Sequence, residues 1–329
     1  MGPTVLVVGE IIADVTVLGA GADGADRVTS GGALQLIART GGSPANVAVG
    51  LARLGVAVGF AGRLSSAGLG PWLATHLLAN GVDVSFSVEA IQEPTLAVVA
   101  LDPDGIASYC FYGADTADWQ WQSEELLRPD RLTVAAIHTG SLAAAIPPGD
   151  ETLASWAEEV RSGGTVLVSY DPNVRPSRVS DPAAFAARVP SWVRRAHLVK
   201  VSEQDLAFLH PGIDAIDIAQ CWAKDGPELV VLTRGADGSV AFRPDGSTIT
   251  ESAPAVPVID TVGAGDAFCS GLLAWLAEAG ALRPGGPGQL SAEDLRSALN
   301  VASQVASVTC TRPGADPPQR PEVADAPWP

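Results

Sequence analysis

Short runs rich in Val, Leu and Ile recur along the chain, and segments with helical spacing of apolar residues fall between many of them. Nearly continuous apolar runs are typical of strands that are covered on both faces. Strands and helices in alternation predict an α/β fold, a three-layer α/β/α arrangement around a doubly wound sheet. Strands are expected at 4–11, 56–62, 96–102, 134–140, 165–171, 197–202 and 228–233, and helices at 72–81, 151–164 and 183–196.

Two stretches interrupt this alternation. Residues 13–40 and 94–118 are rich in Thr, Gly and short alternations and show little helical periodicity. Because two long structureless insertions are unusual in one compact domain, we expect them to build a small β lid on a single domain that spans 1–329. The proline-rich tail, 313–329, is expected to run over the surface without regular structure.

Composition excludes several classes of protein. A chain of 329 residues with 47% hydrophobic and 17% charged residues is globular and can bury a large core. Its net charge of −17 argues against a nucleic-acid partner, and an anionic substrate must be held by local donors. The four cysteines lie far apart without a CxxC pair, so a disulfide framework or zinc site is not expected.

The N-terminus, MGPTVLVVGEIIAD, is apolar but carries no basic segment before its apolar run. We interpret it as a buried first strand and not as a signal peptide. No stretch reaches the roughly 20 apolar residues that a membrane span needs. The sequence therefore predicts a soluble, cytoplasmic protein with no membrane partner.

Residues 41–55, GGSPANVAVGLARLG, carry the signals of a well-delimited helix. Ser43 suits the N-cap, Pro44 suits the first helical position, and Gly55 suits the C-terminal stop. An ordinary amphipathic helix explains these three residues. It does not explain the two glycines that precede the cap.

Gly41, Gly42 and Asn46 suggest a ligand at the start of this helix. Paired glycines let a ligand approach the backbone, and an amide side chain offers a donor and an acceptor together. This combination suits a polyhydroxylated ligand. For Asn46 taken alone, a structural role fits equally well.

The second motif is DTVGAGDAF at 260–268. Gly263, Ala264 and Gly265 before a helix place consecutive N–H groups at the positive end of a helix dipole, which is an anion-binding arrangement. Asp266 would repel a bound phosphate unless it takes part in the chemistry. A carboxylate beside an anion site can take the proton of a hydroxyl that attacks a γ-phosphate, although an acidic residue also suits an ordinary helix start.

The two motifs, in this order and about two hundred residues apart, resemble the two signatures of the ribokinase-like sugar kinases, also called PfkB carbohydrate kinases. KVSEQD (200–205), VLTRGADGSVAF (231–242) and TRPGADPP (311–318) resemble the family's segments around the nucleotide and metal ions. The likeness covers nearly the whole chain. It implies a three-layer α/β/α fold with a β lid, ATP as phosphate donor, Mg²⁺ and K⁺ as cofactors, and pairing of lids in a homodimer.

The resemblance also assigns roles to individual residues. It makes Asp266 the catalytic base, with Gly263, Ala264 and Gly265 as the anion hole. It places sugar hydroxyls at Asp14, Gly41, Gly42 and Asn46, and the nucleotide at Ser202, Thr233, Gly235 and Gly238. It places metal ions at Asp205, Asp260, Val262 (through its carbonyl) and Gly314.

The chain departs from the family pattern in the metal and adenine segments. The usual N-x-x-E near the metal reads Ser202-Glu203-Gln204-Asp205, so the Asn amide is replaced and Asp205 takes the acidic position. In the last helix Ser303, not an asparagine, stands at the usual spacing before Gly314. Asn300 lies nearby, so adenine contacts are assigned to Asn300 and Ser303.

The segment YDPNVRP (170–176) bears on the choice of sugar. Asp-Pro-Asn is a turn formula in its own right, but D-P-N-x-R at a strand end resembles bacterial fructokinases. Arg175 is assigned to the substrate, and a guanidinium also suits nucleotide phosphates. We therefore expect a kinase that converts D-fructose into fructose 6-phosphate.

Two alternatives remain open at this point. A 2-keto-3-deoxygluconate kinase needs donors for the sugar carboxylate, and Arg175 is the one obvious candidate. A non-catalytic sugar-binding regulator on the same fold is also possible, because a fold does not fix a function. The intact Gly-Ala-Gly-Asp argues against it.

Overall fold

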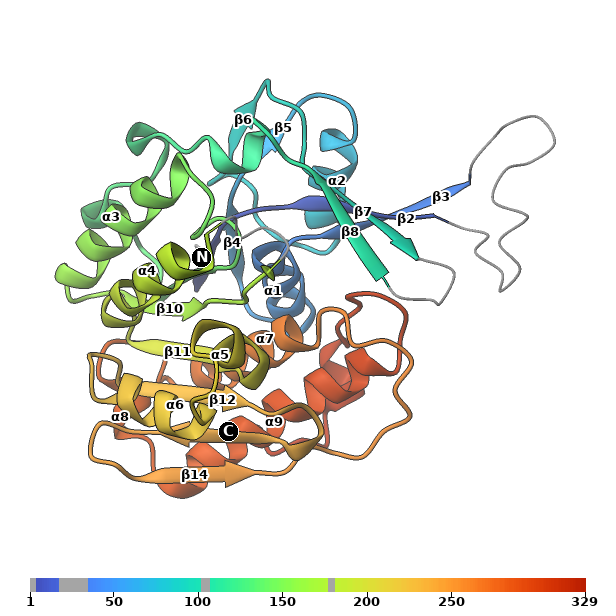
Figure 1. Ribbon diagram of the computed structural model, residues 1–329. Helices are drawn as coiled ribbons and strands as arrows, with labels where there is room; N and C mark the ends of the chain where they lie inside the picture. The colour runs from blue at the N-terminus through green and yellow to red at the C-terminus, as the bar shows by residue number, and fades with distance from the viewer. Residues whose placement is uncertain (1–3, 18–34, 102–106, 177–180) are drawn as a thin grey trace.

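The computed structural model describes residues 4–17, 35–101, 107–176 and 181–329. Its centre is an eight-stranded sheet in the order β14-β13-β12-β11-β10-β9-β1-β4 (Figure 1), in which β13 and β14 run antiparallel to their neighbours and the others are parallel. The strands are β1 (Val5–Val8), β4 (Val58–Ala61), β9 (Ala136–Gly140), β10 (Leu167–Asp171), β11 (Leu198–Ser202), β12 (Leu229–Thr233), β13 (Ser239–Phe242) and β14 (Thr248–Glu251).

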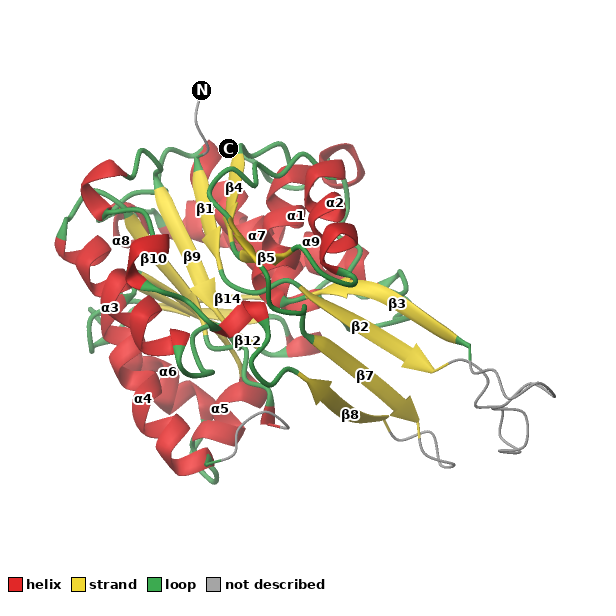
Figure 2. Ribbon diagram, turned by 90° about the horizontal axis from the view of Figure 1, so that it is seen from above, coloured by secondary structure: helices red, strands yellow, loops and turns green. Residues whose placement is uncertain are grey.

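Alternating side chains of β1 reach two separate cores. Val5 and Val7 pack in one apolar cluster, and Leu6 and Val8 pack in the other, so both faces of the strand are covered. Figure 2 shows the helices on the two faces of the sheet. One face carries α1 (Ser43–Arg53), α2 (Gly70–Ala79), α7 (Ala264–Glu278) and α9 (Ala292–Cys310), and the other carries α3 (Gly149–Ser162), α4 (Pro182–Arg195), α5 (Glu203–Leu209) and α6 (Ala215–Ala223).

The predicted three-layer α/β/α fold is therefore confirmed. The expected strand at 96–102 forms, but in a second sheet. That sheet has the order β3-β2-β7-β8 and extends away from the body of the molecule (Figure 1). Its strands are β2 (Ile12–Val17), β3 (Leu36–Gly41), β7 (Leu96–Leu101) and β8 (Ala107–Tyr112). The first two extend one residue beyond the predicted insertion 13–40, and the other two lie within 94–118; 18–34 and 102–106 lie outside the described residues.

Asp118 anchors the base of this second sheet. Its carboxylate accepts the N–H groups of Ile11 (3.1 Å) and Thr95 (3.3 Å), the residues just before β2 and β7. One buried side chain thus joins the starts of two strands that are far apart in the sequence.

Smaller elements complete the fold. A short parallel pair joins β5 (Arg63–Ser65) to β6 (Val88–Ala90), and α8 (Gly286–Gln289) is a single turn. The 3₁₀ helices are η1 (Ala117–Trp119), η2 (Ser123–Glu125), η3 (Pro129–Arg131), η5 (Gly235–Asp237) and η6 (Arg320–Val323).

The C-terminal tail is more ordered than its prolines suggest. It forms η6, and Val323 of η6 and Ala326 after it are buried in the core that contains α7 and α9. Trp275 donates its ring N–H to the carbonyl of Pro327 (3.0 Å), and the Arg320 guanidinium lies 3.3 Å from the ring centre of Trp328. The expectation of no regular structure was therefore wrong at η6, because tertiary apolar contacts decide the conformation there.

Candidate active site

Helix α7 begins at the predicted Gly-Ala-Gly-Asp motif. Its N-cap, Gly263, has φ 76°, a left-handed conformation that glycine adopts without strain. A β-carbon at Gly263 would also lie 2.5 Å from the β-carbon of Ala315. The first N–H groups of a helix have no intrahelical acceptor. The N–H of Ala264 instead donates to the carbonyl of Thr261 in the preceding loop (3.2 Å).

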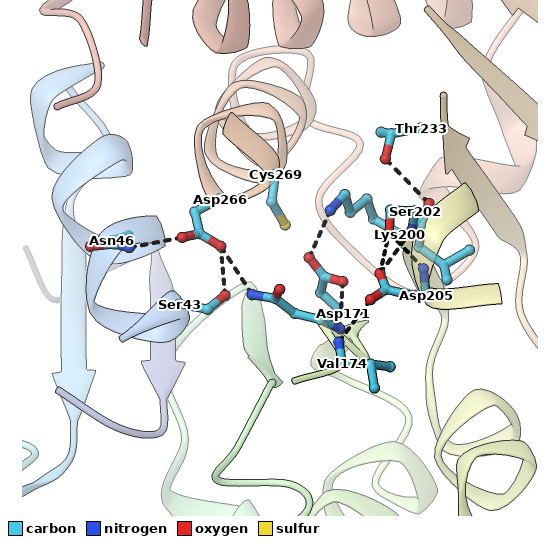
Figure 3. Close-up of polar contacts among 12 residues, drawn as sticks. Ser43, Asn46, Asp171, Val174, Lys200, Ser202, Asp205, Thr233, Asp266 and Cys269 are labelled. Atoms are coloured by element: carbon cyan, nitrogen blue, oxygen red, sulfur yellow. Dashed lines mark hydrogen bonds and ion pairs between the residues drawn. The ribbon is translucent and has the colours of Figure 1, made fainter. Parts of the chain in front are cut away.

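Asp266 lies in the first turn of α7 and is 4% exposed. Figure 3 shows its carboxylate between α7 and the start of α1. The carboxylate accepts hydrogen bonds from Ser43 Oγ (2.6 Å), Asn46 Nδ2 (2.8 Å) and Asn173 Nδ2 (3.3 Å). Hydrogen bonds to an ionised group are stronger than neutral ones. The two sequence motifs therefore meet at this carboxylate.

The start of α1 differs from the sequence prediction. The N-cap is Gly42 (φ 99°) and makes no side-chain capping bond, while Ser43 is already the first residue of the helix. The assignment of Ser43 as N-cap was wrong, because its hydroxyl donates to Asp266 and does not accept a backbone N–H of the first turn. Gly42 is required by space as well, since a β-carbon there would lie 2.7 Å from the Glu10 carbonyl oxygen.

Asp14, on β2, lies against Gly41. A β-carbon at Gly41 would lie 2.1 Å from Asp14 Oδ2, so the glycine makes room for this carboxylate. The pKa of Asp14 is raised to about 6, because burial and the charge of Asp266 raise it more than Arg175 lowers it. The charges of Arg175 and Asp266 therefore act on Asp14, and the binding of sugar by these residues stays a prediction. Arg175 itself is exposed.

Lys200 and Asp171 form a buried ion pair that the sequence did not indicate. Lys200 Nζ lies 3.0 Å from Asp171 Oδ2, and both side chains are less than 5% exposed (Figure 3). Burial works to lower the pKa of Lys200, but Asp171 and Asp205 raise it above its ordinary value. A charged pair therefore joins the end of β10 to the middle of β11.

Ser202 and Asp205 are joined in a capping box at the start of α5. Ser202 Oγ accepts the Asp205 N–H (3.0 Å) and donates to Asp205 Oδ2 (2.6 Å), which also accepts the Ser202 N–H (3.1 Å). Asp205 Oδ1 accepts the Val174 N–H (2.8 Å). A carboxylate has about four acceptor positions, so Asp205 retains about one for a water or a metal ion.

The predicted nucleotide residues lie at the end of β12. Thr233 is the last residue of β12, and Gly235 (φ 55°) begins the turn to β13 with no atom within 4 Å of its added β-carbon. Packing explains the glycine at position 238, because a β-carbon there would lie 2.1 Å from the Glu251 carbonyl oxygen. The turn leaves open space at Gly235 but not at Gly238.

The predicted adenine residues are engaged within the protein. Asn300 donates to Glu251 Oε1 (2.8 Å) and accepts from Gln304 Nε2 (2.7 Å), and Ser303 is 4% exposed. Their contact with adenine stays a prediction.

The predicted cation residues come together from distant parts of the chain. Asp260 Oδ1 accepts the Val262 N–H (3.0 Å), and Asp260 Oδ2 accepts the Gly314 N–H (2.8 Å). Gly314 adopts φ 75°, which favours glycine. The carboxylate thus joins the loop before α7 to the loop after α9.

The sequence did not predict three functional candidates: Ser43 as a donor to Asp266, Asn173, and the Lys200–Asp171 pair. Asn173 lies in the noted Asp-Pro-Asn turn and adopts φ 36°. That turn was the available signal. The ion pair had no local signal, because its partners are brought together only by strand pairing.

The described residues lack two further features. None of their helices is long and apolar enough to cross a membrane. In the same part of the chain, no three His, Cys, Asp or Glu side chains are grouped in a way that could hold a metal ion.

Known proteins resemble this chain throughout its length. A fructokinase from Salmonella typhimurium is 37% identical over 248 residues, 75% of this chain and 80% of that protein. The crystal structure of a fructokinase with bound ATP from Xylella fastidiosa superposes with a TM-score of 0.85 at 27% identity, covering 99% of this chain and 98% of that one. A fructokinase double mutant from Vibrio cholerae O395, in fructose, ADP and potassium ion bound form, gives 0.81 at 27% identity over 99% of both chains.

The model of the pfkB family carbohydrate kinases matches residues 3–322. This match spans the second sheet, the central sheet and both glycine motifs. The resemblance read from the two motifs is thereby confirmed, and the chain belongs to the pfkB family of carbohydrate kinases.

Proposed function

We propose that this protein is an ATP-dependent fructokinase that transfers the γ-phosphate to the primary hydroxyl of D-fructose and releases fructose 6-phosphate and ADP. One observation carries the proposal: Asp266 lies buried at the start of α7, beside the amides of Gly263 and Gly265, where both sequence motifs converge. The likeness to fructokinases of three bacteria supports the choice of sugar.

Two parts of the site carry out the proposed reaction: Asp266 as the base and the start of α7 as the anion site. Asp266 takes the hydroxyl proton as the sugar oxygen forms its bond to the γ-phosphorus and the bond from that phosphorus to the ADP oxygen breaks. The first-turn amides of α7 and the helix dipole stabilise the transferring phosphoryl group. Such a transition state asks mainly for positioning and electrostatic stabilisation.

The sugar site is proposed between the lid and α1. Asp14 and Asn46 offer an acceptor and an amide to hydroxyls, and the glycines at 41 and 42 let the sugar reach the backbone. We propose that the β2-β3-β7-β8 sheet is the lid over this site. Its exclusion of water would favour transfer to the sugar over hydrolysis of ATP.

Mg²⁺ enters as part of the MgATP substrate. Mg²⁺ in kinases is held mostly by phosphates and waters with one or two carboxylates, which fits the single acceptor position left on Asp205. For K⁺, we propose a site made by Asp260, the Val262 carbonyl and the Gly314 loop. The oxygen donors there suit a hard cation, and potassium is present in the related Vibrio cholerae structure.

We also propose that two copies pair through their lids. Leu36 and Tyr112 lie on the same face of the lid sheet and are 53% and 61% exposed. Exposed apolar side chains favour association. Light scattering of the purified protein would show a dimer, and a monomer at all concentrations would contradict the pairing.

A sugar panel tests the function. Purified protein with MgATP and K⁺ should phosphorylate fructose at least tenfold faster, by kcat/KM, than 2-keto-3-deoxygluconate or ribose. Asp266→Asn should lower kcat by about 10²–10⁴-fold while calorimetry still detects sugar binding. Faster turnover of 2-keto-3-deoxygluconate would favour that alternative, and sugar binding without any turnover would favour the regulator.

A further inference from the structure

The hydroxyl of Ser43 contacts the carboxylate that we propose as the base. Ser43 is the first residue of α1 and is 6% exposed. A serine at a helix start commonly turns back to cap the backbone, but here the cap is Gly42. The hydroxyl has one proton to donate, and it donates that proton to Asp266 Oδ1 at 2.6 Å.

Ser43 and Asn46 hold opposite oxygens of the same carboxylate. Ser43 binds Oδ1 and Asn46 binds Oδ2. The two residues are three apart on α1, so their side chains leave the same face of the helix. Rotation of the Asp266 carboxylate about its Cβ–Cγ bond would break both bonds. The pair therefore fixes the plane of the carboxylate.

The remaining acceptor position lies on one oxygen. A carboxylate accepts about four hydrogen bonds, two at each oxygen. Oδ1 accepts from Ser43 and, at 3.3 Å, from Asn173, whereas Oδ2 accepts from Asn46. Oδ2 thus keeps an acceptor position for an incoming hydroxyl.

We infer that Ser43 is a positioning residue that, together with Asn46, turns Asp266 so that Oδ2 faces the sugar hydroxyl. This inference rests on the proposed kinase function. The hydroxyl proton moves to Oδ2 while Ser43 keeps its bond to Oδ1, so Ser43 is neither consumed nor changed. A displacement of about 1 Å in such a group costs about 10²-fold in rate.

A purely structural role is the competing explanation, because the same bond ties α1 to α7. Ser270 provides a matched control at that helix interface. It is a fully buried serine of α7, its hydroxyl donates to the Ala267 carbonyl (2.8 Å), and it packs against Gly50 of α1. It lies one helical turn from Asp266 and makes none of the bonds to that carboxylate.

The test compares Ser43→Ala, Ser43→Thr and Ser270→Ala with the wild type, using fructose and MgATP. Ser43→Ala should lower kcat by about 10- to 100-fold and leave KM for fructose within about threefold. Ser43→Thr, which keeps the hydroxyl, should recover most of the loss, and Ser270→Ala should stay within about twofold. Equal kcat values in Ser43→Ala and Ser270→Ala, or a Thr variant as slow as the Ala variant, would overturn the inference.

A crystal structure of Ser43→Ala gives a readout that needs no substrate. The Asp266 carboxylate should rotate away from its wild-type plane, whereas an unchanged carboxylate would count against a positioning role. If the wild type phosphorylates no sugar, the proposed function fails, yet this comparison still decides what Ser43 does.

Discussion

Lys200 Nζ lies 2.9 Å from the point where a β-carbon at Gly265 would stand. The same nitrogen is held by Asp171 at 3.0 Å and is buried. The ammonium group therefore lies against the first turn of α7, close to the amides proposed to bind the transferring phosphate. Positive charge there adds to the field of the helix N-terminus.

Gly265→Ala should reduce activity for a steric reason. Its methyl group would displace an ammonium that is already held in an ion pair, and would intrude on the turn beside Asp266. We expect kcat to fall at least about tenfold, with a loss of about 1–3 kcal/mol in the free energy of unfolding. Steady-state kinetics and urea unfolding measure both, with Gly163→Ala (φ −65°) as a control. Wild-type kcat in Gly265→Ala would contradict this view of the turn.

Lys200→Met should be strongly destabilising. It leaves the buried Asp171 carboxylate without its counter-ion, which costs about 3–5 kcal/mol, measured by urea unfolding. Adding Asp171→Asn should recover part of that loss by removing the charge. Arg194→Met, in the exposed pair with Asp225, should change stability by less than about 1 kcal/mol. Equal losses of unfolding free energy in Lys200→Met and Arg194→Met would contradict the expected difference between the buried and the exposed ion pair.

Gly41→Ala should weaken sugar binding. The added β-carbon would lie 2.1 Å from Asp14 Oδ2 and force that carboxylate to move. We expect KM for fructose to rise about tenfold or more, with a smaller change in KM for ATP. Gly288→Ala serves as the control, because that glycine also lacks a left-handed φ and its added β-carbon would meet no atom closer than 3.7 Å. Equal changes in the two KM values would argue against a sugar site at Asp14.

Glu10 should make stability depend on pH. Burial, the largest cause, and the nearby charge of Asp118 together raise the pKa of Glu10 from 4.5 to about 7, against hydrogen bonds that lower it. The folded chain therefore binds more protons than the unfolded chain between these pH values, and Glu10's contribution to stability decreases as pH rises through that window. Its ionisation costs about 3 kcal/mol above pH 7.

Glu10→Gln removes this titration. The difference in free energy of unfolding between Glu10→Gln and the wild type should grow in favour of the variant from pH 5 to pH 8, measured by urea unfolding at each pH. Glu89→Gln, at an exposed position, should show no such trend. A constant difference for Glu10→Gln would mean that Glu10 does not titrate in this range.

Asp260→Ala tests the proposed potassium site. It removes the carboxylate that joins Val262 to Gly314. We expect the K⁺ concentration for half-maximal activity to rise at least about tenfold, measured at fixed MgATP and fructose. Asp217→Ala, on the exposed face of α6, serves as the control. An unchanged K⁺ requirement would exclude Asp260 from the site.

The sequence predicted most of the fold because the relevant signals are local. The apolar runs that form β1, β4, β9, β10, β11 and β12 are long enough to read as strands, and the helices between them carry one apolar face. Gly263 and Gly265 likewise predicted the start of α7 from a local pattern. A tail such as η6 could not be predicted, because its structure depends on apolar contacts with distant helices.

The amino-acid sequence by itself thus determined the three α/β/α layers, the two glycine turns and the carboxylate at the start of α7. Tertiary structure alone decided the environment of that carboxylate. Ser43, Asn173 and Asp266 lie far apart in the sequence, so no local pattern reveals their bonds. The Lys200–Asp171 pair likewise exists only because β10 and β11 are neighbours in the sheet. Local propensity fixes each element, but the geometry between elements comes from packing.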